Sequence, residues 1–199
     1  MRRIVLVALA FVATPLAAQD DTPLRPGRTV AGTLAPDSCH TNTIELRDST
    51  YVFGHVNQLT VDVVVTIGPD GEEEAEFDSP ARRPENFMFT SDSAGTYVIA
   101  VTPFDEQAGD YEILLRKAEP VARDRGARID QLMTPYTGDD TPGAVVGIVD
   151  RGTIVFERAY GMANLTFGIP FEVDTPTNIG SVTKQFTAMT ILLLRNDPT

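Results

Sequence analysis

Residues 60–67 read Thr60-Val61-Asp62-Val63-Val64-Val65-Thr66-Ile67. Every second side chain of this stretch is a valine or an isoleucine, and successive side chains of a β-strand point to opposite faces. The alternation therefore predicts a strand that covers a hydrophobic core with one face. The run Gly68-Pro69-Asp70-Gly71, which comes next, predicts a turn.

Strand signals of the same kind continue through residues 28–117. Residues 97–101 and 111–115 are rich in β-branched and aromatic side chains, and a turn signal opens each of them, at Ala94-Gly95-Thr96 and at Ala108-Gly109-Asp110. Several short strands separated by Gly, Pro and Asp, without a helical period among them, are typical of a β-sandwich. We expect residues 28–117 to form an all-β, jelly-roll-like domain.

The order of these signals resembles the bacterial pre-peptidase C-terminal domain, a sandwich found on secreted hydrolases. The resemblance implies an accessory module, linked to secretion or to the binding of a polymeric substrate. It covers about 90 residues and rests on five short motifs: Gly32-Thr33-Leu34, Tyr51-Val52-Phe53, Asp70-Gly71, Gly95-Thr96-Tyr97 and Gly109-Asp110-Tyr111.

Length and charge narrow the class of protein further. The 199 residues, 42% hydrophobic and 22% charged, fit one large or two small globular domains and exclude a disordered or multi-span membrane protein. The net charge of −12 repels phosphate backbones, so nucleic acid is excluded as a partner. Residues 20–118 hold 18 acidic and seven basic residues, a net −11, against −3 in residues 119–199. This asymmetry indicates two units.

The N-terminus has the pattern of a secretory signal peptide. Met1-Arg2-Arg3 is positive, residues 4–13 are apolar, and small residues follow up to Ala18. Residues 4–18 number 15, fewer than the roughly 20 that span a bilayer as a helix. We expect residues 1–19 to be removed near Ala18 or Gln19 and the product to be periplasmic or extracellular. An uncleaved membrane anchor is the alternative.

Neither a metal nor a cofactor is expected. Cys39 is the one cysteine, so no internal disulfide can form, and its neighbour His40 points to the opposite face of an extended segment. We expect a structural or surface role for both residues. The acidic run Glu72-Glu73-Glu74, with Glu76 and Asp78, has the oxygen ligands that Ca²⁺ prefers, but a solvated acidic loop is the favoured interpretation.

The composition changes after Lys117, and residues 119–199 predict an α+β unit. Ala118-Glu119-Pro120 is interpreted as a linker, and residues 121–136 have helical spacing, with Ile129, Leu132 and Met133 on one face. Residues 142–149 are almost continuously apolar and predict a strand buried on both faces. A turn at residues 150–152 and residues 153–161 complete a hairpin, and residues 181–195 predict a last helix, central and dry.

The chemistry is concentrated in Ser181-Val182-Thr183-Lys184. Residues three apart in a helix lie on one face, so Ser181 and Lys184 present a hydroxyl and an amine to the same pocket. A serine hydroxyl becomes a good nucleophile when a neighbouring base takes its proton, and lysine is such a base only where burial disfavours the ammonium. The helix N-terminus directs N–H groups toward an oxyanion at Ser181. The alternative is Ser181 as an ordinary N-cap and Lys184 as a solvent-facing charge.

Residues 142–195 resemble the start of the serine β-lactamase-related family, which includes class C β-lactamases, penicillin-binding DD-peptidases, esterases and D-amino-peptide hydrolases. The resemblance runs from residues 142–149 through Ala159-Tyr160-Gly161-Met162-Ala163-Asn164 to Asn178-Ile179-Gly180-Ser181-Val182-Thr183-Lys184. It implies that Ser181 is the acylated nucleophile and Lys184 its activating partner. The family's later Tyr-x-Asn and Lys/His-Thr-Gly motifs do not occur in these 199 residues, so we expect a fragment of such a domain.

Two hypotheses follow. The chain is part of an exported serine hydrolase that forms an acyl-enzyme at Ser181 with an amide or ester: a β-lactam, a D-amino peptide or a small ester. Alternatively, it is a non-catalytic secreted β-sandwich binding module with an inert hydrolase remnant.

Overall fold

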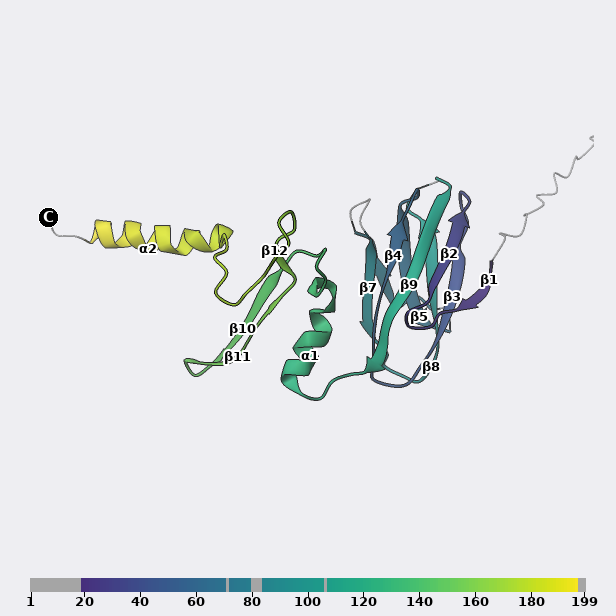
Figure 1. Ribbon diagram of the computed structural model, residues 1–199, viewed down its shortest axis with the longest axis horizontal. Coiled ribbons are helices and arrows are strands. Elements are labelled where there is room, and N and C mark those ends of the chain that lie inside the picture. The colour runs from purple at the N-terminus through teal and green to yellow at the C-terminus, as the bar shows by residue number, and fades with distance from the viewer. Residues whose placement is uncertain (1–18, 71, 80–83, 106, 197–199) are drawn as a thin grey trace, which may run out of the picture. The chain divides into compact units, whose positions relative to one another are not determined.

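The computed structural model describes residues 19–196 apart from residues 71, 80–83 and 106 (Figure 1). The chain divides into two compact units, with the boundary between Gln131 and Leu132. Residues 1–18 of the predicted signal peptide and Gly71 of the predicted turn lie outside the described residues. Within the described part of the chain, no helix is long and apolar enough to cross a membrane.

The first unit is a β-sandwich. Over the described residues, one sheet has the strand order β1-β3-β8-β5-β6 and the other the order β2-β9-β4-β7, and Figure 1 shows the latter four side by side. The β1–β3 pair is parallel and the others are antiparallel. The strands are β1 (Gln19–Pro23), β2 (Thr29–Leu34), β3 (His40–Leu46), β4 (Thr50–Gln58), β5 (Val63–Pro69), β6 (Ala75–Phe77), β7 (Glu85–Thr90), β8 (Gly95–Pro103) and β9 (Gly109–Pro120).

The core of the sandwich contains the alternating residues that decide the fold. Val61, Val63, Val65 and Ile67 are all at most 3% exposed, so the predicted inward face of this stretch is confirmed. Strands β8 and β9 contribute alternate residues in the same way, as expected from their sequences. The predicted turn after β5 begins two residues late, because Gly68 and Pro69 still pair with β8.

The predicted linker at Ala118-Glu119-Pro120 is wrong, because these residues form the end of β9. Ala118 pairs with Val52, Glu119 with Tyr51 and Pro120 with Thr50 of β4. Proline lacks an N–H donor, but it is tolerated at a strand terminus, where the ladder stops. The connection out of the sandwich therefore begins at residue 121.

Helix α1 (Arg125–Leu132) is shorter than the predicted helix over residues 121–136. Asp124 caps it, since its Oδ1 accepts the N–H of Ala127 at 2.9 Å. A separate 3₁₀ turn, η1 (Thr134–Tyr136), follows around Pro135. Of the residues expected on one face, Leu132 is 44% exposed, whereas Gln131, which does not belong to that set, is 6% exposed.

The second unit contains the predicted hairpin and the predicted last helix. Strands β10 (Ala144–Asp150) and β11 (Thr153–Tyr160) pair antiparallel, and the turn between them has φ of +48° at Arg151 and +80° at Gly152, as a type I′ turn requires. Strands β12 (Met162–Asn164) and β13 (Ile169–Pro170) form a second small pair. The turn η2 (Gly180–Val182) leads into helix α2 (Thr183–Arg195).

The burial predicted for these apolar segments is not reached among the described residues, as expected for a unit that lacks the rest of its domain. Val145 and Val149 of β10 are 40% and 64% exposed, and every residue of α2 is exposed. Tyr160 is the one buried hydrophobic side chain among the described residues of the second unit. A strand or helix buries its apolar side chains only when another layer packs on them. No such layer is present among the described residues.

Candidate active site

Ser181 and Lys184 contact each other directly. Ser181 lies in η2 and Lys184 in the first turn of α2, and Lys184 Nζ donates a hydrogen bond to Ser181 Oγ at 3.1 Å. The spacing of three residues had predicted this contact, since one turn of helix brings the two side chains together. A proton can pass between the two atoms without an intervening water molecule whenever the amine is neutral.

The turn before Ser181 is built by Asn178 and Gly180. The Oδ1 atom of Asn178 accepts the backbone N–H of Gly180 at 2.7 Å, and Gly180 has a φ of +52°. This left-handed conformation favours glycine. Two further backbone N–H groups form bonds at the start of the helix: Val182 N–H donates to the Ile179 carbonyl, and Thr183 N–H to the carbonyls of Gly180 and Ser181.

Both side chains of the pair are exposed to solvent. The dry pocket expected around Lys184 is therefore not formed by the described residues. No carboxylate of the described residues forms an ion pair with Lys184. The Lys184 amine is therefore not drawn away from Ser181 Oγ by a carboxylate of these residues.

His40 is buried in the sandwich at the start of β3, and Cys39 directly before it is half-buried. His40 is 8% exposed, and its Nδ1 lies 3.0 Å from the Tyr111 hydroxyl. Burial lowers the pKa of His40, raises the pKa of Cys39 and raises the pKa of Tyr111 to about 12. Each of these shifts favours the uncharged form of its side chain.

The acidic run borders a cavity of about 270 Å³. Glu72, Glu73 and Glu74 line it, together with Asp92 and the ring of Tyr97. Nevertheless, the described residues include no group of three or more His, Cys, Asp or Glu side chains placed to hold a metal ion.

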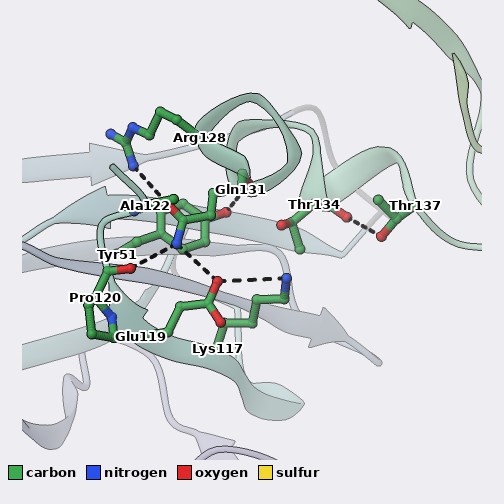
Figure 2. A network of polar contacts seen from close by, with 9 residues as sticks. All are labelled: Tyr51, Lys117, Glu119, Pro120, Ala122, Arg128, Gln131, Thr134 and Thr137. Carbon is green, nitrogen blue, oxygen red and sulfur yellow. Dashed lines mark hydrogen bonds and ion pairs between the residues drawn. The ribbon is translucent and has the colours of Figure 1, made fainter. Parts of the chain in front are cut away.

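Sequence reasoning missed Gln131, which connects α1 to the end of β9 (Figure 2). Its Oε1 accepts the Ala122 N–H at 2.9 Å, and its Nε2 donates to Glu119 Oε1 and to the Pro120 carbonyl, both at 3.0 Å. A single polar residue in a helix gives no periodic signal, so nothing in the sequence marked it as buried. Asn178 was missed as well, although Asn two residues before Gly is a recognisable turn signal.

The segment that contains Ser181 and Lys184 is similar in sequence to known proteins. Residues 128–198 match the family model described as Beta-lactamase. A D-aminopeptidase of Cereibacter sphaeroides is 45% identical over 64 residues, 32% of this chain and 12% of its own length. A D-aminopeptidase of Brucella anthropi is 40% identical over 57 residues, 29% of this chain and 11% of its own length. The chain thus spans about an eighth of these relatives.

Two solved structures are similar over about half of the chain. The pre-peptidase C-terminal domain of a Bacillus anthracis collagenase has a TM-score of 0.40 at 15% identity, covering 51% of this chain and 97% of that domain. A periplasmic inhibitor of g-type lysozyme from Aeromonas hydrophila has a TM-score of 0.38 at 8% identity. The match covers 47% of this chain and 91% of the inhibitor.

The protein therefore joins a β-sandwich to a segment that matches the family model described as Beta-lactamase. The expected order, a β-sandwich followed by a β-lactamase-related segment, is confirmed by the two sheets and by the family-model match.

Proposed function

We propose that this chain is part of an exported serine hydrolase in which Ser181 is the nucleophile and Lys184 its proton acceptor. The observation that carries the proposal is the 3.1 Å contact between Lys184 Nζ and Ser181 Oγ, within the segment that matches the family model. The neutral amine takes the hydroxyl proton as Ser181 Oγ attacks the carbonyl carbon of the substrate.

The chemistry then follows the course of acyl transfer. The carbonyl oxygen becomes an oxyanion, and the partial positive charge at the N-terminal end of the helix stabilises it. The leaving group departs with a proton and leaves an ester on Ser181. Water then attacks this ester, releases the acid and restores the serine.

We also propose that further residues of the same domain pack over Lys184 and bury it. A lysine is a base only where its ammonium is disfavoured by burial. In the described residues, β10 and α2 expose apolar side chains that such a layer would cover, including Val149, Phe186, Leu193 and Leu194. The small share of the curated relatives that this chain spans supports the same view.

Among the expected substrates, we propose an amide of a D-amino acid ahead of a β-lactam or a small ester. The support is that the relatives reported above are named D-aminopeptidases and match the segment around Ser181. A chromogenic D-alanine anilide, a chromogenic cephalosporin and a nitrophenyl ester, each given to the protein expressed from its complete reading frame, separate the three classes.

The expected result is turnover of the D-alanine anilide that exceeds turnover of its L-isomer and is lost in Ser181→Ala. Turnover of none of the three substrates would favour the second function, a secreted binding module with an inert hydrolase segment.

The positive end and apolar run of residues 1–18 support export, and we propose a periplasmic or extracellular location. For the sandwich we propose a role in binding a polymeric substrate.

A further inference from the structure

The turn that precedes Ser181 is held by a side chain that acts on the backbone, not on the substrate. Asn178 Oδ1 accepts the Gly180 N–H at 2.7 Å, and Gly180 is the residue directly before the proposed nucleophile. Asparagine side chains commonly replace a backbone carbonyl in this way and fix a tight turn. The bond therefore restrains the peptide that connects the loop to Ser181.

This restraint is significant because little else holds the turn. Within the part of the chain that the structure describes, residues 176–186 are all exposed, so packing by these residues does not fix the turn. A Cβ at Gly180 would meet no atom within 4 Å, so no side chain of the described residues packs on this side of the turn. Local hydrogen bonds thus set the direction in which η2 presents the Ser181 hydroxyl.

We infer that Asn178 is a positioning residue for acylation: it fixes the turn at Gly180 so that Ser181 Oγ stays within reach of Lys184 Nζ. The inference rests on the proposed function of Ser181. A misplacement of about 1 Å of a reacting group lowers a rate by as much as 10²-fold, so a turn that samples several conformations reacts slowly. Asn178 itself does not touch the reacting atoms.

Two substitutions at this position separate the hydrogen bond from the rest of the side chain. Asn178→Ala removes the acceptor, whereas Asn178→Asp keeps an oxygen at the same place. One local hydrogen bond changes an equilibrium by about three- to tenfold. Asn178→Ala is therefore expected to lower the rate constant of Ser181 acylation by about that factor, and Asn178→Asp to restore most of it.

The control is a similar bond elsewhere in the second unit. Asn164 Oδ1 accepts the Phe167 N–H at 3.0 Å, in a loop that does not include Ser181. Asn164→Ala removes an equivalent bond and is expected to leave the acylation rate unchanged. Both alanine variants should give the same unfolding transition as the parent, because each bond lies in an exposed loop.

The experiment measures how fast a fluorophosphonate, which loses fluoride and forms a phosphonate ester on Ser181, modifies the protein expressed from the complete reading frame, at several probe concentrations. A positioning role predicts that Asn178→Ala lowers the limiting rate and leaves the half-saturating probe concentration within twofold of the parent. Equal limiting rates for the parent and Asn178→Ala would overturn the inference while Ser181 remained the nucleophile. A parent protein that is not labelled at Ser181 would overturn the proposed function itself, and the role of Asn178 with it.

Discussion

The Tyr51 hydroxyl donates a hydrogen bond to the backbone carbonyl of Gln131 at 2.6 Å. Tyr51 is on β4 and is 1% exposed, while Gln131 is in the last turn of α1. The last carbonyls of a helix have no partner within the helix, so this bond satisfies one of them with a core residue of the sheet. Helix α1 is thereby attached to the sandwich at its C-terminal end.

Tyr51→Phe is expected to destabilise the first unit by about 1–3 kcal/mol, because it leaves the Gln131 carbonyl buried without its donor. Urea-induced unfolding measures the loss. Tyr97→Phe is the matched control: Tyr97 is equally buried, but its hydroxyl contacts Ser93 only at 3.4 Å. Equal losses in the two variants would show that the bond to Gln131 contributes nothing specific.

The sandwich is expected to need residues beyond 117 for its full stability. A fragment of residues 19–131 keeps the pairing of residues 118–120 with β4 and the Tyr51 bond to Gln131. A fragment of residues 19–117 lacks both and should be less stable by about 1–3 kcal/mol, because the partners on β4 are left unpaired. Circular dichroism should show β-structure and cooperative unfolding for the longer fragment. Equal unfolding midpoints for both would contradict the prediction.

The stability of the sandwich is expected to decrease at both ends of the pH scale. Burial lowers the pKa of His40 below its ordinary value of 6.5, so the unfolded chain takes up a proton first as the pH falls below that value. Burial raises the pKa of Tyr111 from 10.0 to about 12, so the unfolded chain loses its proton first as the pH rises from about 10 to about 12. The free energy of unfolding should therefore decrease as the pH falls below about 6.5 and as it rises above about 10.

Urea titrations across pH test these two groups separately. His40→Gln should flatten the decrease below pH 6.5, and Tyr111→Phe should flatten the decrease above pH 10, each relative to the parent. Parallel curves for parent and variant in the corresponding range would show that the group titrates alike in the folded and unfolded chains.

Lys184→Ala is expected to slow acylation of Ser181 in the complete protein by about 10²–10⁴-fold, the usual contribution of a general base. Lys184→Arg should be equally slow, because a guanidinium stays charged and cannot accept the proton. Arg195→Ala, at the last turn of the same helix, is the control and should react like the parent. Normal acylation by Lys184→Arg would show that Lys184 acts only as a positive charge.

The sequence predicts a feature well when one local period decides it. Val61 and Val65 follow a period of two and are buried, and Ser181 and Lys184 are one helical turn apart and are in contact. The apolar runs at Val149 and in helix α2 predict burial, but both are exposed here, because burial depends on partners that an apolar run does not specify. Gln131 was missed for the opposite reason, since its polar side chain is buried by bonds to residues that lie elsewhere in the sequence.

The most direct test of the account is peptide mass spectrometry of the complete protein after reaction with a fluorophosphonate or a β-lactam. The account predicts one covalent adduct, on the peptide that contains Ser181, absent in Ser181→Ala and retained in Thr190→Val, which removes another hydroxyl of α2. The 199-residue chain alone, in which Ser181 and Lys184 are exposed, should react feebly or not at all. An adduct that persists after Ser181→Ala would contradict the assignment of the nucleophile.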